Sequence, residues 1–144
     1  MSKTTEQLTQ TFNNNFVAYY RSHVAHVNIL GRNFVSDHKL LQGIYERRQE
    51  QIDRLAELLR SLDDYMPCEI QDVLNNSEIS TAIFEEDADG FLHGVKDDLE
   101  KLKGTYEELM AVADLEGHEE ISNYAQEQIL DLAKSIWMLT ATLS

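Results

Sequence analysis

Apolar side chains recur at steps of three and four residues along most of the chain, which is the spacing of one face of an α-helix. This pattern predicts four long helices, over residues 5–30, 34–62, 90–115 and 119–143. Only a few residues separate the first helix from the second and the third from the fourth. Because short connections join antiparallel neighbours, the pattern predicts two helical hairpins.

The first predicted hairpin turns at Gly31-Arg32-Asn33, where a glycine ends one helix and Asn33 is placed to cap the next. One face of the first helix is predicted to contain the following apolar residues: Leu8, Phe12, Phe16, Tyr20, Val24 (or Val27) and Leu30.

Residues 63–89 do not follow the helical pattern. They contain the only proline, an Asn-Asn-Ser cluster and the acidic run EEDAD, with a short helix predicted over residues 69–74. The connections are therefore short, long and short. A long middle connection can cross the length of the bundle. The third long helix then starts at the same end as the second and runs in the same direction. The sequence therefore predicts an all-α fold, a ferritin-like four-helix bundle with a long crossover that carries a short helix.

Composition narrows the function classes. The 144 residues fit one domain over 1–144, with a short tail over 1–5. The formal net charge of −14 disfavours binding to nucleic-acid phosphates and favours binding of cations. No apolar run approaches the roughly 18 residues of a membrane span, and the N-terminus lacks the apolar centre of a signal peptide. The single cysteine, Cys68, fits a reducing compartment. We therefore expect a cytoplasmic protein without membrane contact.

Four residues form a candidate metal-ligand set: His26, His38, Asp53 and Glu57. The two histidines flank the predicted turn at similar heights on antiparallel helices, so their imidazoles can approach each other. Asp53 and Glu57 lie one helical turn apart. However, they follow His38 by 15 and 19 residues, or about 22 and 28 Å along a helix. If the four share a site, the carboxylates must come from a neighbouring chain, and a two-fold axis would create two equivalent sites.

The region around these residues resembles the Dps family, the mini-ferritins named as DNA-binding proteins from starved cells. The resemblance rests on HVNILGRNFVSDH at 26–38, IDRLAELL at 52–59 and IWML at 136–139, and it extends over nearly the whole chain. It implies a hollow shell of twelve subunits in which iron is oxidised, with hydrogen peroxide as the expected oxidant, and stored as a ferric mineral. By this resemblance, His26 and His38 bind Fe²⁺ together with Asp53 and Glu57 of the two-fold mate. Zinc is a second metal considered for the same site, apart from the resemblance.

The chain departs from the family at three positions. Val27 replaces a common tryptophan thought to quench radicals, Gln42 replaces a frequent acidic residue, and the basic tail of DNA-binding members is reduced to Lys3. Direct DNA binding is therefore not expected. The departures at Val27 and Gln42 leave a second interpretation open. In it, a Dps-like shell protein with weakened or lost ferroxidase activity serves as a structural module or binds another metal.

The turn ADLEGHEEISN at residues 113–123 resembles the family segment that lines the three-fold pores. Asp114, Glu119 and Asn123 are the residues that this resemblance places in the pore, where a ring of carboxylates would attract cations. An ordinary acidic helix turn is the alternative. His23, three residues before His26, is interpreted as a structural residue or as a neighbour of the metal site.

Overall fold

The computed structural model describes residues 2–144, and within this range the protein consists of helices and connecting loops. The helices are α1 (Lys3–Asn28), α2 (Phe34–Ser61), α3 (Ile70–Asn76), α4 (Ala88–Glu116) and α5 (Glu119–Leu143). All four predicted long helices and the short crossover helix are confirmed. Helix α1 begins at Lys3, so residues 3–5 belong to the helix and not to the predicted tail. Met1, also assigned to that tail, lies outside the described residues.

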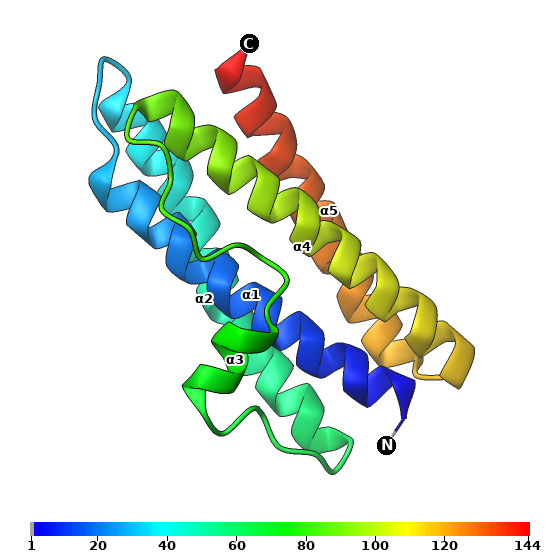
Figure 1. Cartoon of the computed structure of the whole chain (residues 1–144). Helices are drawn as coiled ribbons and strands as arrows, with labels where there is room; N and C mark the ends of the chain where they lie inside the picture. Colours follow the sequence, from blue (N-terminus) through cyan, green and yellow to red (C-terminus); the bar gives the residue numbers. More distant parts are fainter. Residues whose placement is uncertain (1) are drawn as a thin grey trace.

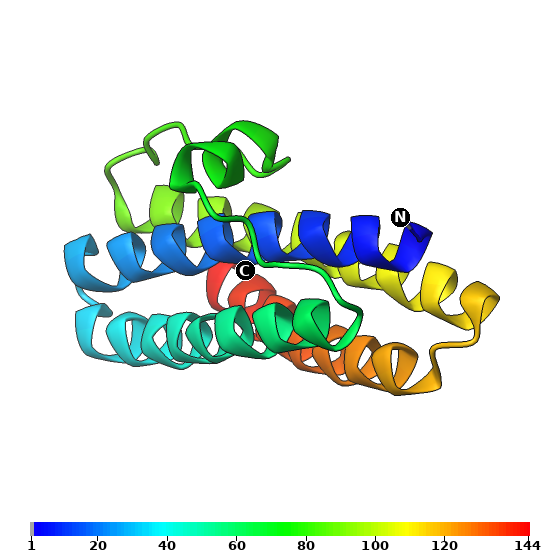
Figure 2. The ribbon, with the colours of Figure 1, turned by 90° about the horizontal axis from the view of Figure 1, so that it is seen from below.

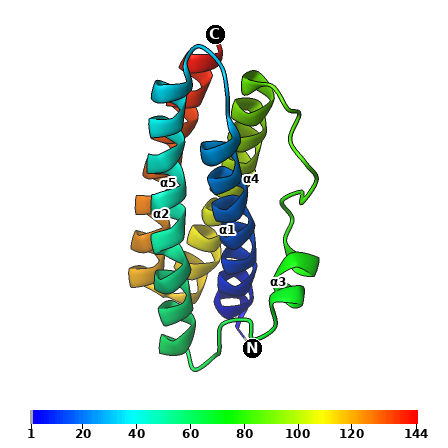
Figure 3. The same ribbon diagram turned by 90° about the vertical axis from the view of Figure 1, so that its left-hand side faces the viewer.

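The four long helices form a bundle in which α1 packs against α2 and α4, and α4 packs against α5 (Figure 1). The crossover from α2 to α4 runs along the outside of the bundle from one end to the other, with α3 beside α1 (Figures 2 and 3). Helices α2 and α4 therefore run in the same direction. This is the ferritin-like arrangement that the short, long, short connections predicted.

The core face of α1 differs in part from the prediction. Its buried apolar residues are Leu8, Phe12, Val17, Ala18, Ala25 and Ile29. Tyr20 and Leu30, which were assigned to the same face as Leu8, are 61% and 77% exposed. A row of residues spaced by four drifts about 40° per step around a helix with 3.6 residues per turn, so Tyr20 has turned away from the core. Leu30 lies beyond the end of α1 at Asn28. In α4, the apolar residues that recur at helical spacing are all buried: Phe91, Val95, Leu99, Leu102, Tyr106 and Leu109.

At the two hairpin turns, the glycines adopt the expected positive φ, but the expected side-chain cap is missing. Gly117 ends α4 with φ 79°, the left-handed conformation that glycine adopts without strain. Gly31 also has a positive φ, of 127°. Asn33 occupies the N-cap position of α2, but its side chain makes no capping hydrogen bond. The turn after α1 is instead closed by backbone bonds, including that from Phe34 N–H to the Gly31 carbonyl.

The crossover is held against the bundle by contacts around Phe84. The guanidinium of Arg21 lies 4.1 Å from the centre of the Phe84 ring, and its Nε donates to Asp98 Oδ2 at 2.7 Å. Arg21 also donates to the carbonyl of Ala82 in the crossover. Phe84 in turn lies directly over Gly94 of α4. These contacts join α1, the crossover and α4. None of the helices within residues 2–144 is apolar over enough of its length to span a membrane.

Candidate metal centre

The structure brings His26 and His38 together as the sequence predicts. His26 lies in the last turn of α1 and His38 in the second turn of α2. Their rings stack with centroids 3.8 Å apart and planes inclined by 16°. His26 is 7% exposed, whereas His38 is half-buried. The pair therefore sits at the edge of the protein, where another molecule can reach it.

Reciprocal hydrogen bonds fix the orientation of the two imidazoles. Nδ1 of His26 lies 2.7 Å from the carbonyl oxygen of His38, and Nδ1 of His38 lies 2.7 Å from the carbonyl oxygen of His26. A carbonyl oxygen can only accept, so each Nδ1 must carry the proton and donate. In the neutral ring, Nε2 then has a free lone pair. Metal-binding histidines show this arrangement, in which the second nitrogen donates to a backbone carbonyl.

Asp53 and Glu57 lie on the same helix but far from the histidines. Helix α2 is continuous from Phe34 to Ser61. Asp53 and Glu57 therefore lie about 22 and 28 Å from His38 along the helix axis. Within residues 2–144, no three His, Cys, Asp or Glu side chains are grouped so that they could hold a metal ion. A complete site therefore requires ligands from outside the single chain.

The two carboxyl groups of Asp53 and Glu57 are exposed and close enough to influence each other. A hydrogen bond with Asp53, followed by the negative charge of Asp53 and by desolvation, raises the pKa of Glu57. Two carboxylates held this close repel each other, and a shared proton or cation relieves the repulsion. The pair is thus suited to complete a cation site.

A set of aromatic residues beside the histidine pair was not identified as part of the site from the sequence. Tyr45 was not among the candidate site residues, and His23 was interpreted as a structural residue or as a neighbour of the metal site. In the structure, the His23 ring stacks on Tyr45 at 4.0 Å, and Tyr45 lies 5.0 Å from the ring of His26. The spacing of Tyr19, His23 and His26, at steps of four and three, was the signal that could have shown these rings share one face.

The predicted pore residues Asp114, Glu119 and Asn123 are all exposed, and they lie around the turn between α4 and α5. Glu116, which lies between Asp114 and Glu119 in sequence, makes contacts within the chain. Its carboxylate accepts hydrogen bonds from the backbone N–H and the hydroxyl of Thr4, which lower the pKa of Glu116. It thereby binds the first turn of α1, where free N–H groups favour a negative charge.

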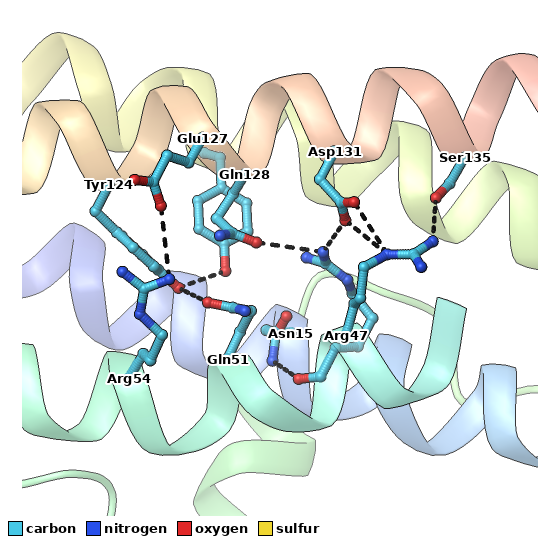
Figure 4. A network of polar contacts seen from close by, with 11 residues as sticks. Asn15, Arg47, Gln51, Arg54, Tyr124, Glu127, Gln128, Asp131 and Ser135 are labelled. Atoms are coloured by element: carbon cyan, nitrogen blue, oxygen red, sulfur yellow. Dashed lines mark hydrogen bonds and ion pairs between the residues drawn. The ribbon is translucent and has the colours of Figure 1, made fainter. Parts of the chain in front are cut away.

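The middle of the bundle contains a polar network instead of a metal-ligand cluster (Figure 4). The guanidinium of Arg48 is 1% exposed and donates to Asp131 and to Gln128. Farther along the bundle, the hydroxyl of Tyr124 donates to Gln51 Oε1 at 2.7 Å. The buried charge of Arg48 disfavours a second cation beside it. The part of the chain that the structure describes also groups no three metal-ligating side chains here.

The chain is similar to known proteins in both sequence and structure. The sequence matches the family described as ferritin-like domain over residues 5–144. It is 29% identical to a DNA protection during starvation protein of Helicobacter pylori, with 99% of each chain covered. It is 31% identical to antigen TpF1 of Treponema pallidum, with 96% of this chain and 78% of the relative covered.

Among solved structures, the chain is similar to the Dps protein of Vibrio cholerae, which is described as a member of a broad superfamily of ferritin-like diiron-carboxylate proteins. The TM-score is 0.92 at 26% sequence identity, covering 99% of this chain and 89% of the other. The similarity extends over the complete bundle and includes the crossover.

Proposed function

The chain belongs to the ferritin-like domain family and, within it, to the Dps mini-ferritins, and we propose that it binds Fe²⁺ at sites between subunits, oxidises it and stores the ferric product. The family as a whole is one of iron-storage proteins. What the proposal adds for this chain is the location of the sites, their ligands and the reaction that they perform.

The observation that carries the proposal is the reciprocal bonding of His26 and His38. Each imidazole is oriented by a 2.7 Å hydrogen bond from Nδ1, which leaves Nε2 available as a ligand. Imidazole nitrogen and carboxylate oxygen are suitable ligands for ferrous iron. Residues 2–144 group no third His, Cys, Asp or Glu side chain with the pair so that it could hold a metal ion, so we propose that the remaining ligands come from a second subunit.

A two-fold axis between antiparallel α2 helices would supply those ligands. Helix α2 has the histidine His38 near its start and the Asp53–Glu57 pair near its end. When two α2 helices pack antiparallel about a two-fold axis, the start of each lies beside the end of the other. The same contact then occurs twice, giving two equivalent sites per dimer. In each site, His26 and His38 of one chain face Asp53 and Glu57 of the other.

An apolar groove beside α1 supports self-association. Tyr20 and Val24 from α1, Ile70 and Leu74 from α3, and Ile83 from the crossover contribute to its lining. The groove has a volume of about 870 Å³, and Ile83 is 94% exposed. Monomeric proteins rarely leave large apolar patches exposed. We propose that assembly covers this surface and that the complete particle is a dodecameric shell.

The acidic turn between α4 and α5 is proposed as the entry route for the substrate. Asp114, Glu119 and Asn123 are exposed there, and symmetry copies of this turn would form a ring of negative charge. Such a ring raises the local concentration of cations such as Fe²⁺. Hydrogen peroxide is the proposed oxidant, and Zn²⁺ is a metal ion that would compete with Fe²⁺ for the same imidazoles. Direct DNA binding is not proposed, because a net charge of −14 opposes it.

The proposal is tested with the double variant His26→Ala, His38→Ala. We expect rapid ferrous oxidation by peroxide to be lost while gel filtration still shows a large particle. His93→Ala is the matched control, since His93 is exposed and lies on α4, a different helix from those of the pair. Unchanged oxidation kinetics in the double variant would contradict the assignment. If the unsubstituted protein forms a large particle but loads no iron, the alternative of a shell without ferroxidase activity replaces the proposal.

A further inference from the structure

An acidic pocket lies between the first half of α1, the start of the crossover and α3, in the region where α3 sits beside α1 (Figure 1). Its volume is about 370 Å³. The residues that line it include Glu6 and Asn13 of α1, Asp64 and Tyr65 of the crossover, and Asp72 of α3. Asn13 precedes His26 by 13 residues, or about 20 Å along α1, so this pocket is separate from the candidate metal centre.

The lining of the acidic pocket carries negative charge. Glu6, Asp64 and Asp72 contribute carboxylates, and the lining residues that the structure describes include no lysine, arginine or histidine. Within residues 2–144, none of these three carboxylates takes part in an ion pair. The guanidinium of Arg60 lies 4.5 Å from the centre of the Tyr65 ring and donates to the backbone carbonyl of Asp64 at 3.0 Å. Arg60 thus contacts two lining residues without pairing with a carboxylate, and the pocket attracts cations.

Asn13 brings an unused hydrogen-bond acceptor to this pocket. The residue is 3% exposed, and its Oδ1 has no hydrogen-bond partner within residues 2–144. The next residue, Asn14, is also buried, but its Oδ1 accepts from the backbone N–H of Glu78 at 2.8 Å. A buried polar atom without a partner destabilises the folded state. An amide oxygen can only accept a hydrogen bond, so the group that Asn13 lacks is a donor.

A single metal ion does not match these features. Within residues 2–144, no three His, Cys, Asp or Glu side chains are grouped so that they could hold one, so the three carboxylates of the pocket do not converge on a point. The pocket volume of about 370 Å³ is many times the roughly 30 Å³ that a water molecule occupies in the liquid, which leaves room for a small organic molecule. Carboxylates that are set apart suit a ligand whose positive charges are set apart as well.

We propose that the acidic pocket binds an aliphatic polyamine. Each ammonium group of such a molecule carries a positive charge and N–H donors, and methylene segments hold these charges apart. One ammonium group donates to Oδ1 of Asn13, and the others lie against the carboxylates of Glu6 and Asp72. The Tyr65 ring attracts an ammonium group as it attracts the guanidinium of Arg60. This binding does not depend on iron oxidation, because no residue of the pocket belongs to the candidate metal centre.

Titration calorimetry of the iron-free protein with spermidine tests the proposal. We expect saturable binding of one spermidine per subunit, and Glu6→Gln, Asp72→Asn should weaken it at least tenfold. The matched control is Asp97→Asn, Glu108→Gln, which removes the same number of charges from exposed positions on α4 and should change the affinity less than twofold. Equal weakening in the two double variants would show that spermidine responds only to the overall charge of the chain, and it would overturn the inference.

Asn13→Leu tests the unused acceptor, because it removes Oδ1 and keeps a side chain of similar size. Spermidine should raise the thermal unfolding temperature of the unsubstituted protein but not that of Asn13→Leu, and an equal rise in both would overturn the assigned contact. If Asn13→Leu does not fold, the calorimetric comparison decides. Mg²⁺ at equal ionic strength should not displace spermidine, whereas displacement would show an unselective cation site and overturn the inference. The variant His26→Ala, His38→Ala should bind spermidine as the unsubstituted protein does, which separates this inference from the proposed function.

Discussion

Nη2 of Arg48 lies 2.6 Å from Oδ2 of Asp131, and this ion pair joins α2 to α5 inside the bundle. The neighbouring Arg47 binds the same carboxylate, with Nε 2.9 Å from Oδ1. The two arginines differ in their access to water: the Arg48 side chain is 1% exposed and that of Arg47 is 39% exposed. Burial removes the solvent that would otherwise stabilise the Arg48 charge, so Arg48 depends on Asp131 far more than Arg47 does.

We therefore expect Asp131→Asn to destabilise the protein strongly. The substitution keeps the shape of the side chain but leaves the guanidinium of Arg48 without a counter-charge, at a cost of roughly 2–3 kcal/mol, reduced from the value for full burial because Asp131 is partly exposed. Arg47→Ala removes a half-exposed ion pair and should cost under about 1 kcal/mol. Urea unfolding at one fixed protein concentration measures both. Equal losses in the two variants would show that burial does not decide the strength of these pairs.

Two glycines of α4 should respond to alanine in opposite directions. A Cβ on Gly94 would overlap Cδ1 of Phe84 in the crossover, whereas a Cβ on Gly104 meets no atom within 4 Å. Gly94→Ala must displace the Phe84 ring, so we expect a loss of roughly 1–3 kcal/mol. Gly104→Ala gains helix propensity without a clash, so we expect a gain of up to about 1 kcal/mol. Thermal unfolding of the two variants checks the difference in sign.

Displacement of the Phe84 ring should also loosen the crossover locally. Phe84 anchors the crossover through its contact with Arg21. In Gly94→Ala, hydrogen exchange should become faster in residues 79–87, while the same residues in Gly104→Ala should exchange as in the unsubstituted protein. Unaltered exchange in Gly94→Ala would show that the crossover is held by its other contacts.

The helices and their order could be predicted because each depends on a signal that is local in sequence. The apolar spacing of α4 from Phe91 to Leu109 and the break at Gly117 each act within a few turns of helix, so the sequence alone locates them. The approach of His26 and His38 was predictable for a similar reason, since both flank one short turn. Residues joined by a short hairpin have few alternative arrangements.

Features that depend on packing between distant segments were not predictable. The run Asn13-Asn14-Asn15 appears polar, yet all three residues are buried, and Asn15 donates to the carbonyl of Arg48 at 2.8 Å. In the sequence alone, nothing distinguishes Arg48 from the surface residues of α2. Its burial follows from the position of Asp131 opposite it in the fold. The stacking of Tyr45 on His23 likewise depends on the rotation of two helices about their axes, which the apolar pattern fixes only coarsely.

A pH-dependent contribution to stability is expected from Asp98. Burial raises the pKa of Asp98 to about 6, against the lowering effect of Arg21, from an ordinary value of 3.8. The folded state therefore holds this proton more readily than the unfolded state. The resulting stabilisation is fully present below pH 3.8 and is lost as the pH rises through about 6. The shift of 6 − 3.8 = 2.2 pH units sets an upper bound of roughly 3 kcal/mol.

The variant Asp98→Asn isolates this effect because it cannot titrate, while every other carboxyl group remains. We expect the unfolding free energy of the unsubstituted protein, relative to Asp98→Asn, to rise as the pH falls from about 6 to 4. Glu108→Gln is the control, since Glu108 is exposed on the same helix. A constant difference between the unsubstituted protein and Asp98→Asn over this range would show that Asp98 is not the titrating group.

Mixed particles provide the sharpest test of sites shared between subunits. The variant His26→Ala, His38→Ala lacks the imidazoles, and the variant Asp53→Asn, Glu57→Gln lacks the carboxylates. Each alone should be inactive in ferrous oxidation. In a dimer that contains one chain of each kind, one site has lost both halves, but the other combines the intact histidines of one chain with the intact carboxylates of its mate.

Co-expression in equal amounts should therefore restore activity that neither variant has alone. Random pairing makes half of the dimers mixed, each with one of its two sites intact, so about a quarter of the original sites should return. Ferrous oxidation per subunit, measured on particles of confirmed mixed composition, checks this value. Sites formed within one chain would stay inactive in every mixture, because no chain has both the histidines and the carboxylates. Recovery of oxidation can thus arise only from ligands contributed by two subunits.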